Sequence, residues 1–183
     1  MNFFLDSHRG LFGFSFEPNF YAPAADDRIP PEERLERFGI WVSSYFQHRD
    51  ISTRNRDALS WVEPSNIRPA AYNNMATEEK AGICYPGGAA SDVPYLGCLL
   101  EQFNDAYRQA FFGDSVKRLF PGFKASFLAG ELSPAFAISS YWTLESDMKK
   151  VGKPFNLKLI PDSNHFVSCF NALKDIDRYP TPV

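Results

Sequence analysis

The sequence predicts an α/β fold with a small, mostly parallel sheet and a helical cap. Short apolar runs typical of strands occur at residues 2–5, within 124–134 and at 155–160. Long stretches with apolar residues at helical spacing lie between the first and second runs, and another lies between the second and third. Because strands that alternate with helices form parallel sheets covered by helices, this order predicts the fold class.

Composition places the chain among ordinary globular proteins. It has 183 residues, of which 44% are hydrophobic and 22% charged, so one domain with a sizeable core is expected. The net charge of -3 leaves no basic stripe for a phosphate backbone, which argues against nucleic acid as a partner. The aromatic content of 16%, with 18 Phe, indicates a large aromatic core or an apolar cavity for a small-molecule ligand.

The cysteines and the first residues bear on cofactors and location. Cys84, Cys98 and Cys169 are odd in number and lack metal-ligand spacing, so we expect no disulfide framework, no zinc site and no cofactor. The sequence begins without a basic leader or a signal-length apolar core. No stretch approaches the roughly 20 apolar residues of a membrane span. The chain is therefore expected to be intracellular, in the cytoplasm.

The chain divides into three parts. Residues 1–29 are predicted to hold one short strand, "NFFL", and an irregular lead-in. Residues 30–115 are predicted to form a helical, cap-like region, with amphipathic helices in 31–49 and 93–112 and short helical pieces around Pro64 and Pro69.

Residues 116–183 are predicted to continue as strand, helix, strand and helix. The strand in "KASFLAGELSP" leads to Ser133, a suitable N-cap, with Pro134 as the first helical residue. That helix is expected to end at Gly152. The strand "FNLKLI" then runs into a Pro-Asp-Ser-Asn turn that delivers His165, and "FVSCFNALKDI" is predicted to be the last helix.

This last third resembles the end of an α/β-hydrolase. "SFLAGELSP", the helix with "LESDMKKVGKP" and "NLKLIPDSNHFV" are similar to that family's penultimate strand, crossover helix, last strand and triad histidine. The resemblance implies that His165 is a general base and that the parent activity is hydrolysis of an ester or similar bond in an apolar small molecule. It also implies that aromatic residues of the cap, namely Trp41, Tyr45 and Phe103, border the substrate, although such stripes more often belong to the core.

Two parts of the family pattern are not matched. The nucleophile elbow, Gly-x-Ser-x-Gly, occurs nowhere in the sequence. Ser133 stands where the family's acid usually does, which leaves Glu131, in the same turn, and Asp6, after "NFFL", as alternative acids. An alternative interpretation of each carboxyl group is an ordinary turn residue without a catalytic role: Glu131 as a solvated charge and Asp6 as a turn former at the end of a strand.

These departures define two hypotheses. One is a hydrolase-family chain that lacks its nucleophile half and is inactive as it stands. The other is a non-catalytic binding or interaction module derived from the same fold. In both, the apolar edge strand "NFFL" could pair with another strand and cause self-association. His8 and His48 are expected to face solvent.

Overall fold

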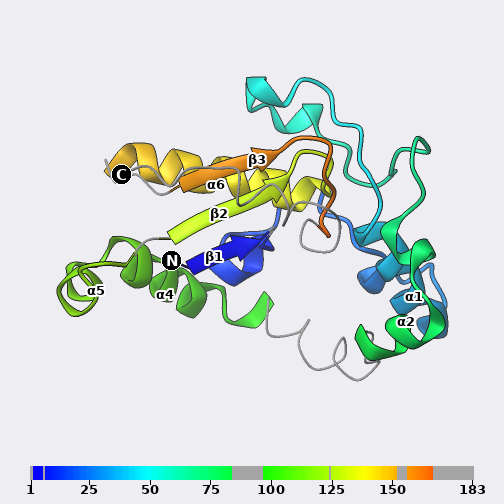
Figure 1. Ribbon diagram of the computed structural model, residues 1–183, viewed down its shortest axis with the longest axis horizontal. Helices are drawn as coiled ribbons and strands as arrows, with labels where there is room; N and C mark the ends of the chain where they lie inside the picture. The colour runs from blue at the N-terminus through cyan, green and yellow to red at the C-terminus, as the bar shows by residue number, and fades with distance from the viewer. Residues whose placement is uncertain (1, 6, 84–96, 124, 152–155, 167–183) are drawn as a thin grey trace.

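The computed structural model describes residues 2–5, 7–83, 97–123, 125–151 and 156–166, and within these it is a mixed α/β fold (Figure 1). The sheet has strands β1 (Asn2–Leu5), β2 (Ala125–Gly130) and β3 (Asn156–Ile160), in the order β1-β2-β3. Both pairings are parallel, with Asn2 opposite Ala125 and Ser126 opposite Asn156. The predicted parallel sheet is confirmed.

The helices of the described residues are α1 (Pro31–Val42), α2 (Thr77–Ile83), α4 (Leu100–Phe112), α5 (Asp114–Leu119) and α6 (Ala135–Val151). Short 3₁₀ turns precede α1 at Arg9–Phe12 (η1) and Pro23–Ala25 (η2), and others lie between α1 and α2 at Ile51–Thr53 (η3), Arg56–Ala58 (η4) and Ala71–Asn74 (η5). The expected helical pieces around Pro64 and Pro69 are not α-helices. Proline lacks the N–H that continues a helix, and this part of the chain forms bends and 3₁₀ turns instead.

Helix α1 ends earlier than its apolar pattern predicts. After Val42 the hydroxyls of Ser43 and Ser44 both donate hydrogen bonds to the carbonyl oxygen of Ile40, at 3.3 and 2.7 Å. Serine side chains that bond to nearby carbonyls compete with continued helix. Ser43 directly follows the last residue of α1, and its carbonyl accepts hydrogen bonds from the backbone N–H of Ala71 and from the side chain of Asn164. The end of α1 is thus bonded to the loop after β3.

The main core lies between β2, α6, η1 and α4. Phe127 of β2 packs on Tyr141 of α6, with ring centroids 6.2 Å apart, and on Phe12 of η1, at 5.9 Å. Tyr107 of α4 completes this aromatic group and is 3% exposed. Strand β2 is buried along its whole length, as the central strand of a parallel sheet should be.

The buried side chain of Arg9 links η1 to α6. Its guanidinium pairs with Glu17 at 3.1 Å and donates hydrogen bonds to the Ser139 carbonyl and the Thr143 hydroxyl, at 3.1 and 3.0 Å. Burial lowers the pKa of Arg9, while the charge of Glu17 opposes that shift. A buried guanidinium with this many partners fixes the segment that follows β1.

The predicted last helix, in 166–176, lies outside the residues that the structure describes, apart from its first residue. Among the helices that the structure describes, none combines the length and apolar character that crossing a lipid bilayer requires. Strand β1 has β2 on one side and stands at an edge of the described sheet, so strand-mediated self-association stays a prediction.

Candidate functional site

The loops that follow the three described strands meet at one edge of the sheet, toward which the strand arrows in Figure 1 point. His8 follows β1, Glu131 follows β2 and His165 follows β3. Because parallel strands end on the same side, residues far apart in the sequence come together there. This edge is the candidate site.

Two imidazoles and three phenylalanine rings form a cluster at this edge, which we call the carboxyl-edge cluster. Phe136, the second residue of α6, stands between the histidines, with its centroid 5.0 Å from that of His8 and 5.3 Å from that of His165. Phe16 and Phe20 also pack on His8, at 5.5 and 5.4 Å, and on each other, at 5.0 Å. Phe136 is buried and the other members are half-buried, so the cluster borders solvent.

His8 is held as a neutral imidazole. Its Nδ1 accepts a hydrogen bond from the backbone N–H of Gly10 at 3.0 Å, which leaves the proton of the neutral ring on Nε2. Burial, followed by the charges of His165 and Arg9, lowers the pKa of His8 from 6.5 to about 4. Near neutral pH this ring is therefore a hydrogen-bond donor through Nε2 and carries no charge.

The loop that carries His165 is fixed by its neighbour Asn164. This side chain is 3% exposed, donates a hydrogen bond to the Ser43 carbonyl at 2.6 Å and accepts one from the N–H of Phe166 at 3.0 Å. The carbonyl of Ser163 accepts a bond from the N–H of Leu132 at 2.8 Å. The Ser-Asn-His motif thus acts structurally through Asn164, which sets the position of the imidazole that follows.

Gly130 lets the same loop approach β2. A Cβ at this position would collide with the carbonyl oxygens of Ser163 and Asn164 and with the hydroxyl of Ser133. Glycine is the residue without that atom, so it permits this close backbone approach. The end of β2 and the His165 loop are in direct contact as a result.

Of the two proposed acids, Glu131 and Asp6, the structure describes Glu131. Glu131 lies at the predicted edge, half-buried, and its N–H donates to the Ile160 carbonyl at 3.0 Å, which extends the ladder between β2 and β3. No ion pair joins Glu131 to His165 among the pairs that the described residues form. Asp6 lies outside the described residues. The acid stays a prediction at both positions.

The expected substrate-binding aromatics are distributed over different parts of the fold. Trp41 is 6% exposed and belongs to the core, where it packs on Phe136 at 6.1 Å and donates from its indole N–H to the Val62 carbonyl. It therefore contacts the cluster through Phe136. Tyr45 is half-buried under the guanidinium of Arg68, and Phe103 is half-buried on α4, which packs chiefly on η1 and α5.

The prediction that His8 and His48 face solvent is wrong, since both are half-buried. His48 donates from Nε2 to the Ser133 carbonyl at 2.8 Å and accepts at Nδ1 from the N–H of Ser60 at 3.0 Å. Burial lowers its pKa, although the bond to Ser133 opposes the shift. Both ring nitrogens are engaged, so His48 is a structural link between the 43–60 segment and the β2–α6 turn.

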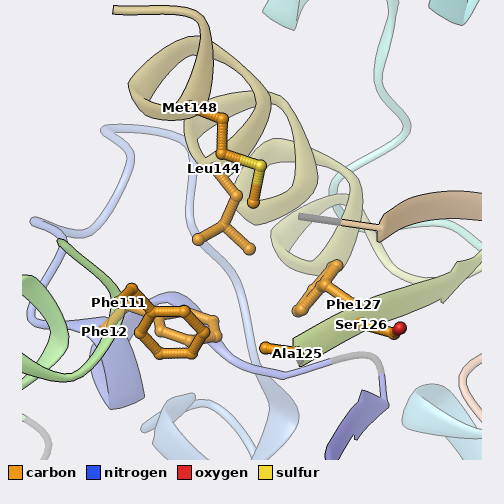
Figure 2. Close-up of a pocket in the computed structure, with 7 residues that line it drawn as sticks. All are labelled: Phe12, Phe111, Ala125, Ser126, Phe127, Leu144 and Met148. Atoms are coloured by element: carbon orange, nitrogen blue, oxygen red, sulfur yellow. The ribbon is translucent and has the colours of Figure 1, made fainter. Parts of the chain in front are cut away.

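A small recess near the start of β2 is distinct from this cluster (Figure 2). It has about 220 Å³ of empty space, counted to its open mouth, which is below the roughly 300 to 1,000 Å³ of typical ligand pockets. Figure 2 shows Phe12, Phe111, Leu144 and Met148 around it, while the Ser126 hydroxyl points away. It is a packing gap of the main core.

Sequence reasoning missed four members of the cluster: His8, Phe16, Phe20 and Phe136. One signal could have found His8, because it follows β1 as His165 follows β3 and both strands were predicted to be parallel. No group of three or more metal-ligating side chains occurs in the part of the chain that the structure describes. No family model, no curated protein and no solved structure matches this chain.

Proposed function

We propose that the carboxyl-edge cluster is the base-bearing part of an α/β-hydrolase-like site for an apolar small molecule with an ester or similar bond. His165 is the general base, and the phenylalanine rings contact the acyl or alkyl part of the substrate. One observation supports this most: a parallel sheet with a half-buried imidazole in the loop after its last described strand, packed against an aromatic wall.

The chemistry follows from the two imidazoles. A base at His165 can take the proton of a nucleophile as it attacks a carbonyl carbon. His8 stays neutral because of its pKa of about 4, and its Nε2–H can donate a hydrogen bond to the carbonyl oxygen on which charge develops. Because no Gly-x-Ser-x-Gly serine is present in the sequence, the chain should not hydrolyse ordinary esters. With an activated ester, water can be the nucleophile: His165 takes a proton from the water as its oxygen bonds to the carbonyl carbon, and the phenolate or alkoxide leaves as the carbonyl re-forms.

Hydrolysis of p-nitrophenyl hexanoate tests the proposal, because this ester is reactive enough to need no serine nucleophile. The parent chain should hydrolyse it faster than buffer, and His165→Ala should lose most of that excess rate. His48→Gln is the matched control, since His48 lies in the link to Ser133 and not in the cluster. If His165→Ala hydrolyses the ester as fast as the parent, the proposal is wrong.

A non-catalytic binding module is the second candidate, favoured by the missing Gly-x-Ser-x-Gly pattern. A fluorophosphonate probe separates the two functions. Labelling at a mapped serine that is lost in His165→Ala would rule out the binding module. Binding of an apolar ketone, together with neither labelling nor ester turnover, would support it. An intracellular location belongs to either proposal and stays a prediction.

A further inference from the structure

An exposed apolar turn joins α5 to β2. Leu119, Phe120 and Phe123 are 73%, 61% and 37% exposed. The N–H of Phe123 donates to the Phe120 carbonyl at 2.9 Å, which closes a β-turn around Pro121 and Gly122. The turn therefore presents two aromatic side chains from its two ends, next to the leucine that precedes it.

This grouping differs from ordinary exposure of apolar side chains. Single exposed residues such as Ile67, at 73%, and Ile83, at 57%, come from separate segments and need no explanation. Contiguous exposed apolar residues, in contrast, mark interaction surfaces. Residues 119–123 form such a group within one short turn.

The charges around the turn indicate the partner. Lys117 and Arg118 precede it and Lys124 follows it, while Asp114 is the one acidic residue from 113 to 124. The whole chain has a net charge of -3, so this positive segment is a local feature. Arg118 is exposed and forms no ion pair with any residue that the structure describes.

We propose that the turn 119–123 docks this chain on an anionic lipid surface. The phenylalanines and Leu119 enter the boundary between headgroups and acyl chains, and the exposed Arg118 lies at the phosphate level. This attachment is peripheral, in keeping with described helices that do not span a bilayer.

The docking surface and the carboxyl-edge cluster lie at opposite ends of β2. The turn comes directly before the start of β2 at Ala125, and the cluster lies beyond its end at Gly130. At about 3.3 Å per residue the strand separates them by roughly 17 Å. Helix α5, which leads into the turn, is at the left of Figure 1, away from the strand arrowheads. The inference therefore does not depend on the proposed function.

Cosedimentation with lipid vesicles tests the inference. We expect the full chain to sediment with vesicles of equal parts phosphatidylcholine and phosphatidylserine, and to stay in solution with phosphatidylcholine alone. Raising the salt from about 0.1 M to about 1 M should release it, because screening shortens the reach of the lipid charge.

Variants separate the apolar and the electrostatic contributions to vesicle binding. Phe120→Ser with Phe123→Ser should weaken binding by roughly ten-fold or more, since two aromatic side chains no longer leave water. Arg118→Glu should weaken it several-fold and reduce its salt dependence. Ile67→Ser, at an equally exposed apolar side chain elsewhere, should bind as the parent does. Circular dichroism of each variant checks that it is folded.

Three results would overturn the inference. One is a parent chain that stays in solution with the anionic vesicles at low salt. Another is binding that the Phe120 and Phe123 substitutions leave unchanged. The third is a concentration-dependent dimer that these substitutions abolish while no vesicle binding occurs, which would make the turn a contact between copies of the chain.

Discussion

His8 and His165 pack against the same ring, that of Phe136, with centroid distances of 5.0 and 5.3 Å. One histidine follows the first strand and the other follows the last described strand, yet the charge of His165 contributes to lowering the pKa of His8. The two rings therefore share one environment, and a change at one should be measurable at the other.

The first prediction concerns the titration of His8. Because burial and two positive neighbours oppose its protonation, its ring should stay neutral down to a pKa of about 4. Since the chain has 3 histidines, NMR can follow each Cε1–H signal separately after assignment by single substitutions. In His165→Ala the pKa of His8 should rise, as one of its charged neighbours is removed. A His8 signal that titrates near 6.5 would contradict this prediction.

The second prediction is a loss of stability on acidification. The folded pKa of His8 lies below the ordinary value of 6.5, so the unfolded chain binds the proton more readily between these pH values. The stabilisation is complete above about pH 6.5 and is lost as the pH falls toward 4. Urea unfolding at several pH values measures it.

His8→Asn is the matched variant for that experiment. An asparagine oxygen can accept the Gly10 N–H in place of Nδ1, while the titratable group is removed. The variant should show a shallower decline of the free energy of unfolding between pH 6.5 and 4. Equal slopes in the two proteins would assign the acid sensitivity to other groups.

The third prediction concerns Gly130. Gly130→Ala should lower the free energy of unfolding by about 2 kcal/mol, because its Cβ meets two backbone carbonyls that cannot rotate away. It should also shift the NMR signal of His165, since the displaced oxygens belong to the preceding residues. Gly82→Ala, where nothing lies within 4 Å of the added Cβ, is the control and should leave that signal in place. Equal effects of both substitutions would refute the close approach.

The fourth prediction is a stabilising substitution at Ser126. Its hydroxyl is buried and finds no hydrogen-bond partner among the described residues. Ser126→Ala removes that unsatisfied group and should raise the free energy of unfolding by about 1 kcal/mol. Ser115→Ala, at an exposed serine of α5, should change it by less than about 0.5 kcal/mol. A destabilised Ser126→Ala would show that the hydroxyl has a partner after all.

The regular elements could be predicted because their signals are local. "NFFL", "SFLAG" and "NLKLI" are apolar runs bounded by turn residues, and they form β1, β2 and β3. Helix α6 follows from the apolar spacing after Pro134. The early end of α1 has a local part, the bonds of the Ser43 and Ser44 hydroxyls to the Ile40 carbonyl. Its other part could not be predicted from a local pattern, because it consists of hydrogen bonds from Ala71 and Asn164 to the Ser43 carbonyl.

The site was predictable in part. The sheet edge and His165 follow from the strand order, whereas the burial of His8 and His48 depends on residues distant in the sequence. His48 shows why this burial could not be predicted: its hydrogen-bond partner Ser133 is 85 positions away, and no local sequence pattern indicates such a pair. Trp41 shows the opposite case, since its helical spacing favoured the core and the structure buries it.

The most direct test of the site is the response of the histidine NMR signals to an unreactive apolar carbonyl compound, such as 2-octanone. If the carboxyl-edge cluster binds such molecules, the signals of His8 and His165 should shift together and saturate at the same ligand concentration, while the signal of His48 stays in place. Shifts at His48 alone, or at none of the three histidines, would contradict the account.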